Sequence, residues 1–227
     1  MDRESLAEIL GMELDAIRVV PSACGGGFGS KLDVSFQPYV ALATWVVGRP
    51  ARICYSRGDS MCASTKRHPS DIRLAVGCDE IGRISGFVFD GIFNTGAYAS
   101  WGPTVANRVP IHASGPYTTK DYRANSVAVH TNAPPAGAFR GFGVPQSAVA
   151  QECAFDLLAE KLGMDRLAFR RLNALKNGVP TVTGQVFNSG VGIDECFAAL
   201  EDSWHTAVSS AASFNQTAIS DDSPWRR

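Results

Sequence analysis

The spacing of apolar residues predicts several short helices along the chain. The first covers about residues 5–11, where a glycine stops it. A more apolar helix is expected over 33–47, with its regular part starting nearer Pro38, because proline is best accommodated in a first turn. Further helices are predicted at 105–111, 145–162, 165–175 and 194–200.

Alternating apolar and polar residues predict strands between these helices. The predicted strands are 15–21, 52–56, 72–76, 84–93 and 126–130, and the third and fourth form a hairpin. This succession indicates an α+β fold of mixed sheets with packed helices. Residues 201–227 are rich in Ser, Ala and Thr without a sustained period, so a loosely ordered tail is expected there.

Composition narrows the class of protein. The formal charge of −1 disfavours a nucleic-acid binder, because such proteins need clustered basic residues. No apolar run approaches the ~20 residues that a membrane span requires, and no signal peptide opens the chain. The six cysteines never lie closer than eight residues, so CxxC motifs are absent and buried, reduced thiols are expected. A cytoplasmic protein that binds neither membrane nor nucleic acid is therefore expected.

Two glycine-rich loops carry the candidate chemistry. Gly25–Lys31 reads GGGFGSK, and Ala138–Gly143 reads AFRGFG. The first loop fails the Walker A pattern and the dinucleotide fingerprint, since neither its lysine nor its glycines are correctly spaced. Two Gly-Phe-Gly loops, each with a cation nearby, suggest one large anionic ligand held between them. The alternative is that the glycines only make tight turns.

Taken in order, these loops and several shorter motifs resemble one known family. The other motifs are Gly48-Arg-Pro50, Arg67-His-Pro69, Thr95-Gly-Ala-Tyr98, Pro145-Gln146, Ala159-Glu-Lys-Leu-Gly163 and Arg171-Leu-Asn173. Together they resemble the molybdenum hydroxylases, the family of xanthine dehydrogenase and aldehyde oxidase, and specifically their molybdopterin-binding subunit. The resemblance implies that residues 1–200 form part of the molybdopterin-binding domain.

The resemblance implies a cofactor site in the two loops. Gly26, Gly27, Phe28 and Gly29 would lie against the molybdenum cofactor, as plain molybdopterin or in its cytosine dinucleotide form. Ala138, Phe139 and Arg140 would hold the pterin side. No residue of this chain would bind the metal directly.

A substrate pocket is implied beside the cofactor. Phe142 corresponds to the phenylalanine that stacks on the substrate ring, and Arg108 to an arginine that binds a substrate oxygen in xanthine-type enzymes. Leu32 stands where those enzymes place a glutamate. Asp33 could substitute for that acid, although a helix N-cap is its expected role. The mixture favours an N-heterocycle, or an aromatic substrate with one acceptor oxygen or carboxylate, over xanthine.

Parts of the family's machinery are missing from the sequence. The Gly-x-Gly-Glu motif of the general base does not occur, so no catalytic residue is expected in this chain, and it should be inactive alone. Iron–sulfur and FAD modules would reside on partner chains, together with the remaining molybdenum-subunit segments. Two further interpretations are a fragment that keeps the fold without binding cofactor, and an unrelated hydrolase with a Cys or Ser nucleophile, for which no nucleophile elbow exists.

Overall fold

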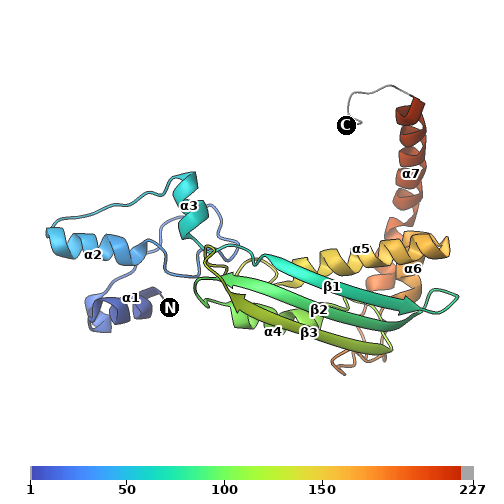
Figure 1. Ribbon diagram of the computed structural model, residues 1–227, viewed down its shortest axis with the longest axis horizontal. Coiled ribbons are helices and arrows are strands. Elements are labelled where there is room, and N and C mark those ends of the chain that lie inside the picture. The colour runs from blue at the N-terminus through green and yellow to red at the C-terminus, as the bar shows by residue number, and fades with distance from the viewer. Residues whose placement is uncertain (1, 221–227) are drawn as a thin grey trace. The chain divides into compact units, whose positions relative to one another are not determined.

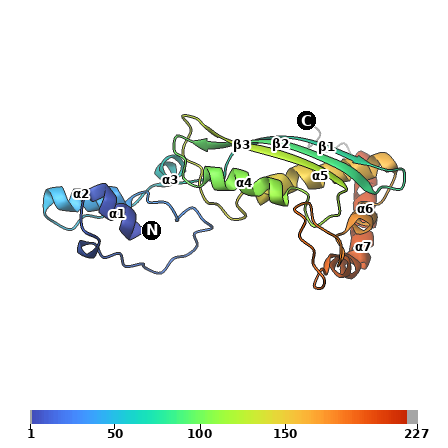
Figure 2. The ribbon, with the colours of Figure 1, turned by 90° about the horizontal axis from the view of Figure 1, so that it is seen from below.

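The computed structural model describes the backbone of residues 2–220. The helices are α1 (Asp2–Leu10), η1 (Leu14–Ala16), α2 (Gln37–Val47), α3 (Arg57–Ala63), α4 (Gly102–His112), α5 (Val144–Leu162), α6 (Arg166–Asn173) and α7 (Ile193–Ser220), and the strands are β1 (Ser70–Cys78), β2 (Ile84–Gly96) and β3 (Asp121–His130). Figure 1 shows the three strands side by side, and Figure 2 shows α4 along one face of the sheet. No described helix is long and apolar enough to cross a membrane.

The sheet has the order β1-β2-β3 and is mixed. β1 and β2 form the predicted hairpin, whereas β3 returns through α4 and runs parallel to β2. The parallel register is visible at the strand ends, because His130 and Thr131 bond the Gly96 carbonyl while Gly86 lies beside Asp121. The predicted α+β class is confirmed.

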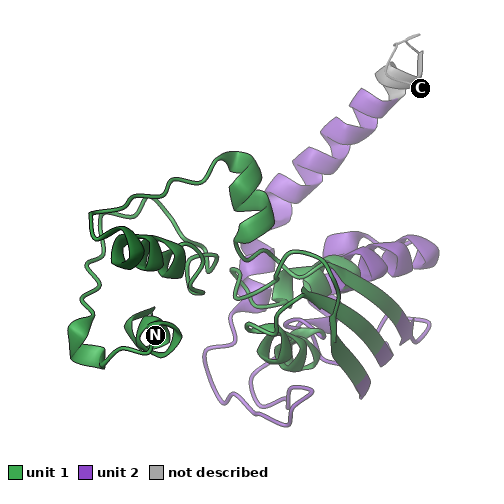
Figure 3. Ribbon diagram, turned by 60° about the vertical axis from the view of Figure 1, so that its left-hand side comes forward, with its two compact units in different colours: residues 1–74, 89–113, 124–150 green, residues 75–88, 114–123, 151–227 purple. Residues whose placement is uncertain are grey.

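The described residues divide into two compact units, which Figure 3 colours separately. Unit 1 comprises residues 1–74, 89–113 and 124–150, and unit 2 comprises 75–88, 114–123 and 151–227. In unit 1 the inward side chains of β2, Phe89 and Phe93, are fully buried with Val105 and Val109 of α4. Apolar burial is the main force that holds such a core together.

Unit 2 has an aromatic core of its own. Phe155 lies edge-on to Tyr117 and to Phe169, with ring centroids 5.1 and 5.5 Å apart. The buried Asn173 side chain bonds the backbone of Ile84 and Gly82, which ties α6 to the start of β2. The oxygen and the nitrogen of the Asn173 amide both have a partner, as burial of polar atoms requires.

Most helix predictions are confirmed, and one is wrong at its end. Asp165 caps α6 through the N–H groups of Leu167 and Ala168, as expected. The expected short helix at 194–200 instead continues as α7 to Ser220, so the loosely ordered tail is not observed up to that residue. Residues 193–220 contain no glycine or proline, and acidic residues occupy the first turn, so the helix can propagate without a periodic apolar face. Residues 221–227 of the predicted tail lie outside the described part.

Two strand predictions are wrong, and one helix was not predicted. Residues 15–21 form η1 and then an unpaired extended segment, and 52–56 are likewise extended without a partner among the described residues. α3 was not predicted, although its capping box is readable as Ser56 followed three residues later by Asp59. The start of α2 at Gln37 agrees with the later of the two predicted starts.

The cysteines are unpaired as predicted, but the prediction that they are buried is wrong. All six cysteines are free, but five are exposed and Cys78 is intermediate, so none is buried. None of the six therefore belongs to the apolar core of either unit.

Candidate cofactor and substrate site

The first glycine loop is built from residues in conformations that L side chains rarely tolerate. Gly26, Phe28 and Gly29 have φ values of 138°, 52° and 96°. A turn closes the loop, since the N–H of Ser30 donates to the Gly27 carbonyl at 2.9 Å. This conformation turns the Phe28 ring outward, where it is 62% exposed. An aromatic surface beside open backbone is suited to a planar heterocycle.

The second loop shares part of that conformation, since its phenylalanine and the glycine that follows it also have positive φ. Gly141, Phe142 and Gly143 have φ values of 91°, 48° and 89°. Here the N–H of Phe142 donates to the Phe139 carbonyl at 2.8 Å. A side chain at Gly143 would collide with Val109 and Val105 of α4, so glycine allows the loop to lie directly on that helix.

The two loops bond to each other. The Arg140 N–H donates to the Phe28 carbonyl at 2.7 Å. A Cβ atom at Gly29 would collide with the Ala138 carbonyl oxygen, so only glycine permits this approach. The structure thus brings together the two motifs that the sequence paired, although more than a hundred residues separate them in the chain.

Backbone donors remain open on both sides of that junction. Within the described residues, the N–H groups of Gly26, Gly27, Phe28 and Gly29 donate to no protein acceptor, and the same holds for Phe139 and for Ala138, although Ala138 is fully buried. Arg140 is exposed and makes no salt bridge with a described residue. Clustered free N–H groups beside a cation favour the binding of anionic oxygens. This chemistry fits a phosphate-bearing pterin cofactor.

Arg67 supports the second loop, which sequence reasoning did not anticipate. Its guanidinium lies 4.7 Å from the centroid of the Phe139 ring, and Nη2 donates to the Arg140 carbonyl at 2.8 Å. Nη1 reaches Gln146 Oε1 at 3.3 Å, and the Gln146 amide donates to the His68 carbonyl at 3.1 Å. Arg67 and Gln146 belong to motifs that the sequence had singled out, but nothing in their spacing indicated that they touch.

The predicted substrate residues Phe142 and Arg108 lie together. The Arg108 guanidinium is 6.0 Å from the Phe142 ring centroid, and Trp101 meets the same ring edge-on at 6.1 Å. Arg108 is exposed on α4 and has no salt bridge among the described side chains. Trp101 was missed because no motif includes it. These three residues form a cationic and aromatic corner next to the second loop.

Leu32 and Asp33 line a cavity of about 260 Å³ that also includes Thr65 and Ser100. The expected N-cap role of Asp33 is wrong, because α2 begins only at Gln37. The N–H groups of Ser35 and Phe36, just before the helix, donate to the side chain of Gln37 instead. Asp33 instead accepts from Ser100 Oγ at 2.9 Å, and its buried Oδ2 has no partner among the described residues.

Lys31 contacts the residue that precedes the first loop, Cys24. Its ammonium donates to Cys24 Sγ at 3.0 Å and lowers the pKa of that thiol. Because α2 begins at Gln37, its N-terminal N–H groups do not belong to this loop. The charge at this loop is therefore carried by side chains and free N–H groups.

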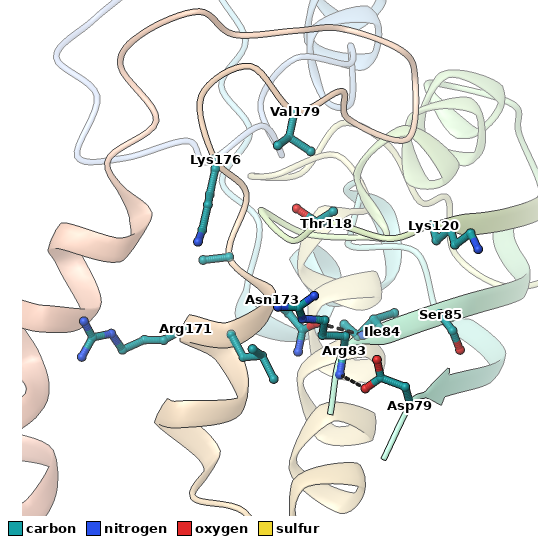
Figure 4. A pocket seen from close by; sticks show the side chains of 12 residues that line it. Asp79, Arg83, Ile84, Ser85, Thr118, Lys120, Arg171, Asn173, Lys176 and Val179 are labelled. Atoms are coloured by element: carbon teal, nitrogen blue, oxygen red, sulfur yellow. Dashed lines mark hydrogen bonds between the residues drawn. The ribbon is translucent and has the colours of Figure 1, made fainter. Parts of the chain in front are cut away.

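A second cavity, of about 660 Å³, lies within unit 2 and contains none of the predicted site residues. Its wall carries Asp79, Arg83, Lys120, Arg171 and Lys176. Figure 4 shows the side chains of Lys120 and Arg171 pointing away from each other, and Arg171 is already paired with Asp194 and Glu201. The cations do not converge, so this cavity is not a competing site.

Comparisons with known proteins show which family the chain belongs to. Residues 1–174 match the family model described as the molybdopterin cofactor-binding domain. The chain is 41% identical over 194 residues to the nicotinate dehydrogenase large molybdopterin subunit of Eubacterium barkeri, covering 86% of this chain and 46% of that subunit. It is 34% identical over 196 residues to the xanthine dehydrogenase molybdenum-binding subunit of Escherichia coli O157:H7, covering 86% of this chain and 26% of that protein.

Solved structures agree with this class. The aldehyde oxidoreductase of Desulfovibrio gigas superposes with a TM-score of 0.87 at 29% identity, over 93% of this chain and 23% of that one. Quinoline 2-oxidoreductase of Pseudomonas putida 86 superposes with a TM-score of 0.81 at 25% identity, over 96% of this chain and 28% of that one. The chain belongs to the molybdenum hydroxylase family and corresponds to part of its molybdopterin-binding region. It spans less than half the length of each of these relatives.

Proposed function

We propose that this chain supplies part of the cofactor site of a molybdenum-dependent hydroxylase or dehydrogenase that oxidises an N-heterocycle or an aldehyde at carbon, using oxygen derived from water. The observation that carries the proposal is the hydrogen-bonded pair of Gly-Phe-Gly loops, with free N–H groups on both sides of the junction. Two tight turns with no ligand would not need to leave these donors open at the same place.

The cofactor, when bound, supplies the redox and oxygen-transfer chemistry. In this chain, the N–H groups of Gly26, Gly27, Phe28 and Gly29 would donate to its anionic oxygens, while Ala138, Phe139 and Arg140 would hold the pterin. We propose molybdopterin, in its plain or cytosine dinucleotide form. No side chain of this chain is assigned to the metal.

Arg108, Phe142 and Leu32 are proposed to select the substrate. An aromatic ring can stack on Phe142, and the nearby Arg108 guanidinium can bind a carboxylate or ring oxygen and stabilise negative charge that develops there. Leu32 offers no acceptor for a second ring N–H. The relatives named for nicotinate and quinoline support an N-heterocycle, and Arg108 favours one that carries a carboxylate.

The proposed enzyme needs further polypeptide. The general base, iron–sulfur clusters and FAD are assigned to other segments or subunits, and the assembly is proposed to be cytoplasmic. The chain alone is then inactive. The second candidate is a non-catalytic fragment that keeps the fold, which the missing Gly-x-Gly-Glu motif favours.

The test is the molybdenum and pterin content of the chain, purified after co-expression with the reading frames on either side of its gene. Near-stoichiometric molybdenum in a stable complex, with oxidation of an N-heterocycle, supports the proposal. A stable complex that lacks molybdenum would support the non-catalytic fragment instead.

A further inference from the structure

One strained residue outside the two glycine loops is not explained by the proposed cofactor site. Among the described residues other than glycine, only Phe28, Ser100 and Phe142 have a positive φ, and the value for Ser100 is 41°. Phe28 and Phe142 belong to the loops, whereas Ser100 directly precedes Trp101, the N-cap of α4. This region of φ is unfavourable for an L residue, so nearby contacts must hold Ser100 there.

The contact that holds the Ser100 side chain comes from Asp33. Ser100 Oγ donates to Asp33 Oδ1 at 2.9 Å, and a hydrogen bond to a carboxylate is stronger than one between neutral groups. Packing contributes little, because Ser100 is exposed and lines the cavity of about 260 Å³ together with Asp33. α4 has no side-chain cap at its N-terminus. The bond to Asp33 therefore fixes the backbone from which an otherwise uncapped helix starts.

The same pair of side chains lies against the start of the second loop. A Cβ atom at Gly137 would collide with Asp33 Oδ2 and with Ser100 Oγ, so glycine permits this close approach. Gly137 precedes Ala138, the first residue of the second loop, and Asp33 lies two residues after Lys31, the last residue of the first. One carboxylate thus joins three segments: the end of the first loop, the backbone before the second and the residue before α4.

α4 carries the two side chains that meet the Phe142 ring. Trp101 and Arg108 are seven residues apart, a spacing that places two side chains on the same face of a helix. The Trp101 ring and the Arg108 guanidinium lie 6.1 and 6.0 Å from the Phe142 centroid. A shift at the start of α4 would therefore displace both groups relative to Phe142.

We propose that Asp33 is a positioning residue for substrate recognition. Through its bond to Ser100 it fixes the start of α4, and it thereby sets the places of Trp101 and Arg108. A carboxylated N-heterocycle needs this arrangement, because its charge must reach Arg108 while its ring stacks on Phe142. The inference rests on the proposed function, and it assigns Asp33 no contact with the substrate.

The first part of the test uses the full chain alone and needs no cofactor. Hydrogen–deuterium exchange with mass spectrometry follows the first-turn amides of α4. Asp33→Ala and Ser100→Ala should each speed their exchange about tenfold, and the double variant should add nothing, because both changes remove one bond. Asp33→Asn keeps an acceptor oxygen and should restore exchange to within about threefold of the wild type. Protection of the β2 amides shows that each variant is folded.

The second part uses the molybdenum-loaded complex, obtained by co-expression with the flanking reading frames. The probes are pyridine-3-carboxylate and its uncharged amide, and the selectivity is the ratio of their kcat/KM values. Asp33→Ala should lower this selectivity about tenfold at unchanged molybdenum content, whereas a general loss of folding would lower both kcat/KM values alike. Combining it with Arg108→Gln should lower the selectivity no further than Arg108→Gln alone. Asp71→Ala is the control for loss of an acidic charge, since Asp71 is exposed on β1.

Unchanged exchange in Asp33→Ala and Ser100→Ala would overturn the positioning role. A loaded complex that oxidises neither probe, or whose selectivity is the same in Asp33→Ala and the wild type, would overturn the role in substrate recognition. In both of these cases the molybdenum is present, so the proposed cofactor function stands. A stable complex without molybdenum would instead refute the proposed function and the substrate role of Asp33 with it, so the two failures are distinguishable.

Discussion

At the residue scale, Arg108 is the most direct test of the substrate site. Its guanidinium faces the Phe142 ring and has no salt-bridge partner among the described residues. In the reconstituted complex, Arg108→Gln should lower kcat/KM about tenfold or more for a carboxylated N-heterocycle, because one charged hydrogen bond is lost. The same variant should affect an uncharged heterocycle much less. Equal effects on both substrates, or unchanged kinetics, would remove Arg108 from substrate binding.

Cys24 offers a second residue-scale test that requires no cofactor. Lys31 lowers the pKa of the Cys24 thiol, whereas burial and Asp79 raise the pKa of Cys78. Since the thiolate is the nucleophile, iodoacetamide at pH 7 should alkylate Cys24 severalfold faster than Cys78. Lys31→Met should raise the pKa of Cys24 and reduce that rate. Peptide mapping after timed alkylation measures both, and an unchanged rate in the variant would contradict the Lys31 contact.

At the scale of elements, the junction of the two glycine loops depends on Gly29. A methyl group there would collide with the Ala138 carbonyl, and a φ of 96° is itself unfavourable for alanine. Gly29→Ala should therefore separate the loops and lower the molybdenum content of the complex by about tenfold, the equivalent of ~1.4 kcal/mol of binding energy. Gly25→Ala is the matched control, because its added Cβ meets no atom within 4 Å. Equal molybdenum content in both variants would argue against the junction as the cofactor site.

Arg67 connects the second loop to the segment before β1. Arg67→Met removes two hydrogen bonds and the contact with Phe139, and should lower the free energy of unfolding by about 1–3 kcal/mol. Urea unfolding of the purified chain measures the change. Arg83→Met is the control, since Arg83 is exposed and its side chain has no partner among the described residues. A loss of equal size in the control would mean that the general loss of charge, not the Arg67 contacts, sets the stability.

Elements with local signals were predictable from the sequence, and those that depend on distant partners were not. The β1–β2 hairpin, α5 and the Asp165 cap of α6 each have their signal within a few residues. The segments 15–21 and 52–56 carry an equally clear strand pattern, but strand formation also requires a neighbour. The contacts of Arg67 and Trp101 join residues far apart in the chain, so no spacing rule could find them.

The motifs of the candidate site were predictable, but their geometry was not. Matching Gly-Phe-Gly sequences suggested that both loops serve one ligand, and the structure shows them bonded. The sequence did not show that Phe28 and Phe142 share a positive φ, or that Asp33 bonds Ser100 instead of capping α2. When a side chain such as Asp33 could bond either of two partners, only the three-dimensional arrangement decides which partner it bonds.

At the scale of the whole molecule, His68 should make stability depend on pH. It is 3% exposed, its Nε2 has no partner among the described residues, and burial lowers its pKa. Below about pH 6.5 the unfolded chain takes up a proton on this imidazole that the folded chain does not, so stability present above that pH is lost as the pH falls. The loss per proton is at most about 1.4 kcal/mol per pH unit.

This pH dependence can be assigned by comparing variants. His112 also has a lowered pKa, through burial and the nearby Arg108, so the wild-type slope between pH 7 and 5.5 contains contributions from both histidines. His68→Gln should flatten that slope while lowering the stability at pH 7, because the neutral imidazole is buried next to Gly102 at the start of α4. His112→Gln should remove only its own part. If the slope of His68→Gln equals that of the wild type in urea unfolding at several pH values, His68 is protonated in the folded state, and its Nε2 must then have found an acceptor.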